Sequence, residues 1–262
     1  MKIIKLLIAF FSLTALASCI DVEENILIND DDSGAYTMTM DMGKLFELKN
    51  QLGGGKEESG KPKEKKDTLI YVKDLMRNND SVTAEEKELY KDATVKLNLD
   101  EANAEMKMVL SCPFKSINQL PVIKKNFYTF LNKLNVFDNL SNKPKPEGGS
   151  DDNEEMPSQV LNPGADKHQE FTAMPGKIEN NIVSPENYKT EMMTDSSMLM
   201  MQQMSAMMGD MNFKTTITSA KEIKNYVGNG AKLSDNKKTV TFITTFTEMM
   251  EHPEKLSYKV EY

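Results

Sequence analysis

The sequence predicts an α+β fold: antiparallel sheets with helices on one face, arranged in two similar halves and joined by disordered linkers. Segments that alternate apolar and polar residues, the pattern of half-buried strands, recur along the chain. Each of them runs directly into a short helical stretch. The order is seen in "YTMTMDMGKLFELK", "EMKMVLSCPFKSINQL", "NFKTTITSAKEIKNYV" and "TVTFITTFTEMMEH". Their spacing differs, so they indicate a common architecture rather than a strict repeat.

Residues 1–18 have the features of a secretory signal peptide. Lys2 and Lys5 form a basic start, and the apolar run "LLIAFFSLTALAS" follows. This run is shorter than the ~20 apolar residues that a membrane-spanning helix needs. It ends in small residues, which suit the active site of a signal peptidase. We therefore expect residues 1–18 to be removed.

The run ends in Leu16-Ala17-Ser18-Cys19, which resembles the lipobox of bacterial lipoproteins at all four positions. The resemblance implies that the sulfur of Cys19 receives a diacylglycerol. It also implies cleavage before Cys19 and acylation of the new amine, with palmitate as a typical chain. Each buried methylene contributes ~0.8 kcal/mol, so these chains would hold the protein on a membrane. The alternative is an ordinary secretory signal in which Cys19 has no special role.

The residues after the cysteine bear on location. Ile20 stands where an aspartate retains many lipoproteins in the inner membrane, which implies the outer membrane. Asp21, Glu23 and Glu24 follow, and they resemble the acidic tether of lipoproteins displayed on the cell surface. A solvated tether in the periplasm is the alternative. We expect residues 19–25 to be a tether and the protein to be lipid-anchored at the outer membrane, at the cell surface or on the periplasmic face.

Two later stretches, residues 53–66 and 141–170, are dominated by glycine, proline and charged residues. Such segments cannot bury enough apolar surface to offset their chain entropy. We expect both to be disordered. The second would then separate an N-terminal α+β part, residues 26–140, from a C-terminal α+β part, residues 171–262.

The N-terminal part predicts two hairpins and several helices. Tyr36, Met38, Met40 and Met42 share one face of a strand by their period of two. Thr83, followed by glutamates, is typical of a helix N-cap. The expected elements, in order, are strands over 25–28 and 36–42, helices over 43–52, 67–78 and 83–92, strands over 95–99 and 104–110, and a helix over 116–137.

The C-terminal part shows the same pattern of alternating strands and short helices. A helix is capped by Asp195 or Ser196 and ends near Gly209, and a second short helix stops at Pro253. The expected elements are an extended segment over 171–182, a helix over 195–210, strands over 213–217 and 240–246, a helix over 247–252 and a strand over 255–262.

The start of the mature chain resembles LppM-like bacterial lipoproteins. The resemblance rests on a strand, an acidic turn with glycine and the strand "GAYTMTMD" soon after the lipidated cysteine, together with the final strand pair. It implies an antiparallel sheet with helices and a role in binding lipid.

Charge and cysteine content exclude several classes of protein. The formal net charge is −8, whereas nucleic-acid binding needs basic residues that neutralise phosphates. With Cys19 acylated, Cys112 is alone and no internal disulfide can form. Cys112 lies in the apolar stretch "MVLSCPF", so we expect a small core residue.

Methionine is concentrated between residues 192 and 211. On a helix, one stripe is predicted to contain Met200, Met204, Met207, Met208 and Met211. Three interpretations stay open: ordinary core packing, a groove that faces a lipid or a partner, and a Cu(I) site, since thioether sulfur is a soft ligand.

No catalytic pattern is present in the sequence. His168 and His252 lie in no triad or metal spacing, and neither a "GxSxG" elbow nor a phosphate loop occurs. We expect no enzyme and no cofactor. The leading function is a non-catalytic binding or interaction role in the cell envelope, with the membrane and an envelope protein as partners.

Two other functions stay open. The first is a carrier or chaperone of a small hydrophobic ligand, whose cavity would exceed ~300 Å³ and would be lined by Met204 and Phe242. The second is a Cu(I)-binding lipoprotein that uses the methionine-rich helix.

Overall fold

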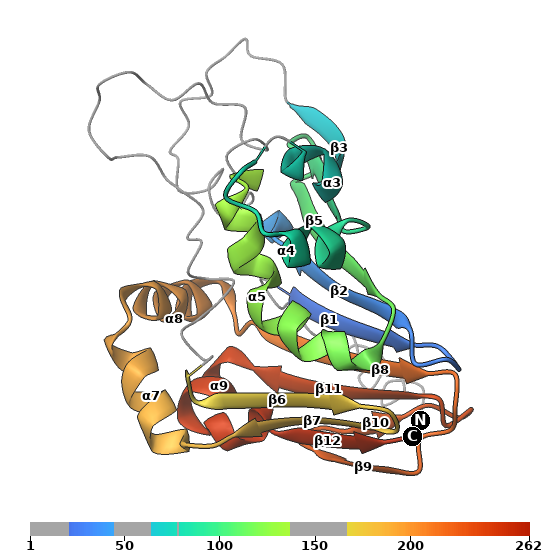
Figure 1. Ribbon diagram of the computed structural model, residues 1–262. Coiled ribbons are helices and arrows are strands. Elements are labelled where there is room, and N and C mark those ends of the chain that lie inside the picture. The colour runs from blue at the N-terminus through green and yellow to red at the C-terminus, as the bar shows by residue number, and fades with distance from the viewer. Residues whose placement is uncertain (1–20, 45–63, 78, 137–166) are drawn as a thin grey trace, which may run out of the picture.

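The computed structural model describes residues 21–44, 64–77, 79–136 and 167–262 (Figure 1). These residues form twelve strands in two sheets and six α-helices. The predicted α+β content is confirmed. No helix in the described part of the chain is long and apolar enough to cross a bilayer.

The large sheet has eight strands in the order β10-β11-β8-β1-β2-β5-β4-β3. All neighbours are antiparallel except β1 and β8, which run parallel. The parallel pair departs from the predicted antiparallel sheet. The strands are β1 (Asp21–Ile28), β2 (Gly34–Asp41), β3 (Lys65–Tyr71), β4 (Thr94–Asp100), β5 (Glu105–Phe114), β8 (Asn212–Ser219), β10 (Lys232–Leu233) and β11 (Thr239–Thr245).

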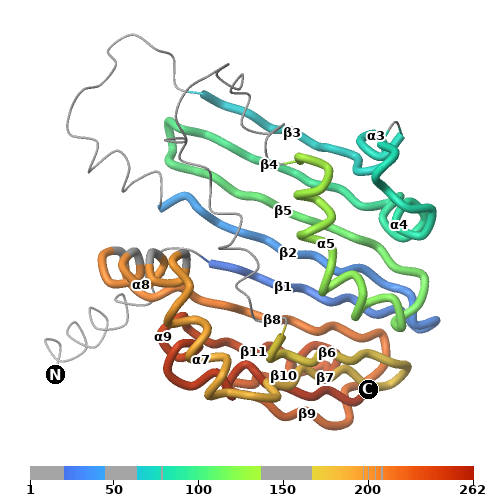
Figure 2. The backbone as a smooth tube through the Cα atoms, turned by 60° about the vertical axis from the view of Figure 1, so that its left-hand side comes forward, coloured from blue at the N-terminus to red at the C-terminus, as the bar shows by residue number. Residues whose placement is uncertain are grey.

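The small sheet has four antiparallel strands in the order β6-β7-β12-β9. It lies on the same face of the large sheet as the long helix α5 (Leu120–Lys133), and both views show this arrangement (Figures 1 and 2). The strands are β6 (Gln169–Met174), β7 (Lys177–Ile182), β9 (Asn225–Gly228) and β12 (Tyr258–Glu261).

The remaining helices gather at the ends of the large sheet. Two short ones, α3 and α4, lie near β3 and β4, whereas α7, α8 and α9 lie near the beginning of β1 (Figure 2). Their bounds are α3 (Val72–Met76), α4 (Ala84–Tyr90), α7 (Pro185–Thr194), α8 (Ser196–Met208) and α9 (Phe246–Glu251), and the 3-10 turns are η1 (Ile117–Gln119) and η4 (Pro253–Leu256).

The two faces of the large sheet differ in chemistry. Inward-facing residues such as Ile26, Tyr36 and Ile217 are at most 2% exposed and form the main core. The outer face carries polar pairs between neighbouring strands, for example Thr216 with Thr241 at 3.4 Å. This division follows from the period-two patterning of the strands, because a one-sided sheet buries alternate side chains.

Helix α5 is specified by local signals at its start. Ser116 and Gln119 form a reciprocal capping box that opens η1, and Pro121 lies in the first turn of α5. Ile123 and Phe127 then pack into the core, 0% and 2% exposed. Burying side chains of this size contributes ~1.5–3 kcal/mol each, so packing rather than helix propensity holds α5 on the sheet.

The predicted N- and C-terminal parts share one sheet. β1 lies between β2 of the first part and β8 of the second, and the β1–β8 pairing runs from Asp21↔Asn212 to Ile28↔Ser219. The predicted parts are therefore not two separate sheets. Parallel strands need a long crossover connection. Here it is the whole chain between β1 and β8, and its last elements are β6, β7, α7 and α8.

Several predicted boundaries are corrected. β1 begins at Asp21, so most of the predicted tether, residues 19–25, is strand. β3 begins at Lys65 and β6 at Gln169, inside the two predicted linkers, whose remaining residues up to 63 and 166 lie outside the described residues. The first half of the predicted helix over 67–78 belongs to β3, because "DTLIY" is rich in strand-forming side chains and pairs with β4. Its second half contains the helix α3, Val72–Met76.

Other predicted elements are confirmed. The Thr83 capping box at α4 is present, as are the hairpins β1–β2 and β4–β5. Most of the predicted helix over 43–52 lies outside the described residues. The sequence analysis missed α7, β9 and β10.

Because β8 lies inside the large sheet, the two parts should not fold separately. We expect fragments 21–136 and 167–262, produced alone, to lack a cooperative thermal transition by circular dichroism, since each exposes an unpaired strand and an uncovered core. Mixing them should restore the transition. As a control, the full chain cleaved at a protease site inserted between residues 136 and 167 should keep both pieces associated. Cooperative unfolding of either fragment alone would contradict this assignment.

Candidate functional site

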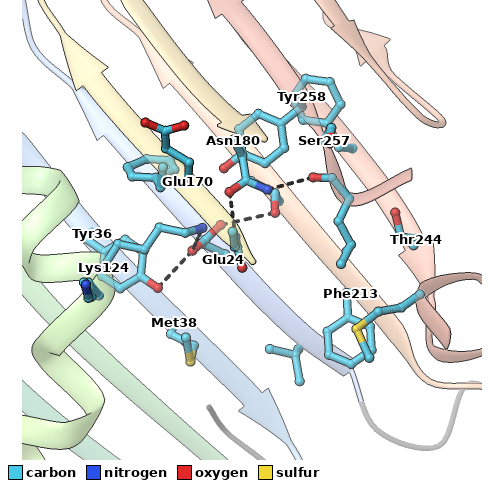
Figure 3. Close-up of a pocket in the computed structure, with 18 of the residues that line it drawn as sticks. Glu24, Tyr36, Met38, Lys124, Glu170, Asn180, Phe213, Thr244, Ser257 and Tyr258 are labelled. Carbon is cyan, nitrogen blue, oxygen red and sulfur yellow. Dashed lines mark hydrogen bonds and ion pairs between the residues drawn. The ribbon is translucent and has the colours of Figure 1, made fainter. Parts of the chain in front are cut away.

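A pocket of about 500 Å³ lies between the large sheet, the small sheet and α5 (Figure 3). This volume is within the range of ~300–1,000 Å³ that small-molecule sites occupy. The exposed lining residues Val122, Lys125 and Asn126 belong to α5 and form one rim, and the exposed Glu170 of β6 lines the pocket as well. The pocket is thus a space that the tertiary arrangement of three elements creates.

Most of the lining is aromatic or aliphatic. The large sheet contributes Val22, Met38 and Phe213, and the other side contributes Phe171 and Leu256. These side chains come from strands and turns that are far apart in the sequence. Apolar walls with a few converging polar groups are typical of ligand sites.

Glu24 is the central polar residue of the pocket. It lies on the inward-facing side of β1, in line with Val22 and Ile26. Its Oε1 accepts hydrogen bonds from the hydroxyl of Tyr36 at 2.9 Å and from Nζ of Lys124 at 2.5 Å. Its Oε2 accepts one from Oγ1 of Thr215 at 3.2 Å. The carboxylate therefore joins β1, β2, β8 and α5.

Lys124 brings a positive charge into the pocket. Its side chain is 16% exposed and that of Glu24 is 12% exposed, so the ion pair is largely removed from water. The ammonium also lies 4.8 Å from the centroid of the Phe171 ring, a cation–π distance. An ammonium has three donors, so Lys124 keeps donor capacity beyond its bond to Glu24.

Tyr258 holds a buried hydroxyl in the same pocket. The residue is 6% exposed, and its ring stacks on Phe242 with centroids 4.8 Å apart. Figure 3 shows the Tyr258 side chain directed into the pocket that Glu24 and Lys124 line. Its hydroxyl has no hydrogen-bond partner among the residues that the structure describes. A buried polar group without a partner is destabilising by ~1–3 kcal/mol, which points to a partner that a bound molecule or water supplies.

Two of the four tyrosines that line the pocket, Tyr36 and Tyr258, are hydrogen-bond donors at physiological pH. Burial raises the pKa of Tyr258 well above its ordinary value, and the charge of Glu24 adds to the effect. Burial and the neighbouring Glu24 raise the pKa of Tyr36 in the same way. Both phenols therefore stay protonated.

The small sheet is fixed beside the pocket by the amide of Asn180. Its Nδ2 donates to the carbonyl of Leu256 at 2.8 Å, and its Oδ1 accepts from Nε2 of Gln169 at 2.6 Å. Ser257 accepts from the backbone N–H of Ile182 at 3.0 Å. These bonds hold β6, β7 and the chain before β12 in one arrangement, so this wall of the pocket is preorganised.

The structure separates the predicted site residues. Phe242 lines the pocket, and its ligand role stays a prediction. Met211 lies beyond the end of α8 and is 1% exposed, whereas Met207 is 63% exposed, so they do not share a stripe. Neither lines the pocket. The side chains of Met200, Met204 and Met208 lie outside the described side chains, and their ligand role stays a prediction.

The buried methionines near α8 form a second core. It includes Tyr188 and Phe246 and touches the pocket through Val22, Phe213 and Leu256. We call this group the methionine cluster, after its six methionines Met192, Met198, Met201, Met211, Met249 and Met250. Among the described side chains of α8, the buried ones are thus Met198, Met201 and Ser205.

Other chemistry-bearing residues lie elsewhere. Cys112 is fully buried, and burial raises the pKa of its thiol to about 12, so it is an inert core residue. His168 pairs with Glu191 at 2.9 Å, and His252 lies 3.3 Å from Glu254. Within the ranges that the structure describes, no group of three histidine, cysteine or acidic side chains could hold a metal ion.

The sequence analysis missed Glu24, Lys124 and Tyr258. The sequence did contain a signal for Glu24, because this glutamate alternates with the apolar residues Val22 and Ile26 on one side of the strand. Lys124 likewise lies four residues after the buried Leu120 on the packed side of α5. Tyr258 carried no such signal, since a tyrosine in a strand is usually ordinary core.

The chain is similar in structure to the folded domain of LppM from Mycobacterium tuberculosis, solved by NMR. The superposition covers 94% of this chain and 91% of that one, with 9% sequence identity and a TM-score of 0.35. A likeness at this level assigns neither a family nor a function. No family model and no curated protein matches the sequence.

The buried pair Glu24–Lys124 gives a test of the site's electrostatics. We expect Lys124→Met to lower the free energy of unfolding by ~3 kcal/mol, because it leaves an uncompensated buried carboxylate. The double variant Glu24→Gln/Lys124→Met should recover much of this loss, since glutamine still accepts from Tyr36. Urea unfolding of the single and double variants measures the coupling.

The matched control for this cycle is the exposed pair Lys115–Glu88, 2.9 Å apart. Lys115→Met should change stability little, because water screens an exposed ion pair. Equal losses in the free energy of unfolding for Lys124→Met and Lys115→Met would show that the pocket pair contributes no more to stability than an exposed pair.

Proposed function

We propose that this protein binds one small amphiphilic molecule between its two sheets and performs no catalysis on it. The apolar walls would hold the hydrophobic portion. The polar end would accept hydrogen bonds from Tyr258 and Lys124. This proposal corresponds to the carrier alternative of the sequence analysis and makes the leading non-catalytic binding role more specific.

The observation that carries the proposal is the unpartnered, buried hydroxyl of Tyr258 in an apolar pocket of about 500 Å³. Buried hydroxyls normally have a hydrogen-bond partner. Tyr90, Tyr258 and Tyr262 have buried hydroxyls without a partner among the described residues, and of these three only Tyr258 lines the pocket. The nearby Glu24 accepts from three other donors and not from Tyr258, so we assign the acceptor for Tyr258 to a ligand.

We further propose that the protein is a lipoprotein of the cell envelope, anchored through Cys19. The support is the lipobox Leu16-Ala17-Ser18-Cys19. Placement in the outer membrane rests on Ile20 after the cysteine. Cu(I) binding through the methionines stays a third prediction.

Ligand binding is tested by native mass spectrometry of a soluble form that starts after Cys19, purified from the periplasm of its own host. We expect a non-covalent adduct of lipid mass. The identified molecule, titrated back, should bind Tyr258→Phe about 3- to 10-fold more weakly, the loss of one hydrogen bond of ~1 kcal/mol.

Tyr90→Phe is the matched control for Tyr258→Phe. The Tyr90 hydroxyl is also buried and unpartnered among the described residues, but Tyr90 does not line the pocket. Removal of the Tyr90 hydroxyl should leave the affinity for the ligand unchanged. A clean apo mass of the wild type, or equal affinities of both variants, would contradict the ligand proposal.

The anchor is tested separately by Cys19→Ala in the full-length precursor. We expect this variant to leave the membrane fraction after carbonate washing, because acyl chains supply the membrane affinity. Unchanged retention, with detergent partition as a second measure, would refute anchoring through Cys19.

A further inference from the structure

We propose that the exposed face of α8 lies on the same bilayer that holds the N-terminal lipid. The proposed occupant of this face is the zwitterionic headgroup region of the membrane. The inference rests on the Cys19 anchor put forward above. It goes beyond that anchor because it assigns a second membrane contact and therefore an orientation of the folded protein.

The first observation is the composition of α8. Aspartate, glutamate, lysine and arginine make up 27% of the whole chain, yet "SSMLMMQQMSAMM" contains none of them. Its buried side is Met198, Met201 and Ser205. Of the α8 side chains that the structure describes, the exposed ones are all uncharged: Ser196, Leu199, Gln202, Gln203, Ala206 and Met207.

The exposed side of α8 presents large apolar groups to solvent. Leu199 is 42% exposed and Met207 is 63% exposed. On the adjoining α7, Met193 is 49% exposed. Apolar side chains on an uncharged surface are typical of an interaction site, and flexible methionine adapts to irregular surfaces.

The second observation is the position of α8 relative to the anchor. After α8 ends at Met208, the chain enters β8, where Nδ2 of Asn212 donates to Oδ1 of Asp21 at 3.2 Å. Asp21 follows Cys19 by two residues, and two residues span at most about 7 Å. An acyl anchor on Cys19 would therefore enter the bilayer at the end of the sheet where α8 is attached. Figure 2 shows α8 at the beginning of β1.

The third observation is that α8 is held firmly to the sheet. Oδ1 of Asp210 accepts from Oγ of Ser205 at 3.2 Å and from the backbone N–H of Thr247 at 3.1 Å. Burial alone would raise the pKa of Asp210, but hydrogen bonds from Thr245 and Thr247 outweigh it and lower the pKa. The carboxylate thus fixes the end of α8 to the start of α9.

The membrane occupant follows from charge and from the anchor. The chain has a net charge of −8, which disfavours anionic headgroups, whereas an uncharged face carries no such penalty at zwitterionic ones. A small apolar face is enough to bind the membrane here, because the lipid anchor already holds the protein at the membrane surface and so gives α8 a high effective concentration there. Contact on this side would also bring the pocket residues Val22 and Phe213, which adjoin the methionine cluster, toward the lipid.

The absence of tryptophan makes a clean test available. The mature, acylated protein carrying Met207→Trp is reconstituted in phosphatidylcholine vesicles. We expect a blue-shifted emission relative to the detergent-free soluble form, and quenching by lipids brominated near the glycerol backbone. Amphipathic helices insert ~5–10 Å into the headgroup–acyl boundary, so lipids brominated at the chain end should quench less. Leu199→Trp should behave in the same way.

Val227→Trp is the matched control, because Val227 is 62% exposed on β9 of the small sheet. It should show neither shift nor quenching. The acylated variants Met207→Trp and Leu199→Trp could instead show the same emission and quenching as Val227→Trp. That result would overturn the contact of α8 with the membrane and point to a protein partner. An intact mass without acylation would refute the anchor and, with it, this proposal, while ligand binding in the pocket is measured independently.

Discussion

The parallel pairing of β1 with β8 is the constraint on which the rest of the structure depends. It inserts the last third of the chain beside the first strand, and it makes one eight-stranded sheet from both parts. The long crossover that a parallel pair requires contains β6 and β7. Together with β9 and β12, which follow β8, these strands form the small sheet over the inner face. The pocket exists because that second sheet covers β1, β2, β8 and β11 without filling the space completely.

Glu24 shows how the same strand sets the chemistry of the pocket. A charged residue in an inward phase is unfavourable unless it is paired and hydrogen-bonded. Here Tyr36, Thr215 and Lys124 meet that requirement, and each comes from a different element. The polar centre is thus compatible with folding only when β1, β2, β8 and α5 are all in place, which ties the binding site to the integrity of the sheet.

The methionine-rich segment serves two environments at once. Its buried methionines pack with α7 and α9 into the methionine cluster, while Leu199 and Met207 face outward on an uncharged surface. Thioether side chains suit both settings, because they fill irregular cores and adapt to mobile apolar partners. Pocket, methionine cluster and α8 follow one another from the interior to the end of the sheet that adjoins Cys19.

Local sequence was enough to predict the α+β class, most strands and the capped helices α4 and α5, because period, caps and turns act over a few neighbouring residues. The core position of Cys112 was also predicted correctly, whereas the lipobox at Cys19 stays a prediction. The sequence analysis misplaced β3 as a helix, because a seven-residue strand next to a short helix lacks a distinct period.

The site itself was decided by tertiary structure. Glu24 and Lys124 are one hundred residues apart in sequence, and Tyr258 reaches the pocket only through the pairing of β12 with β7 and β9. Such contacts depend on which strands pair over long distances, and no local propensity encodes that choice.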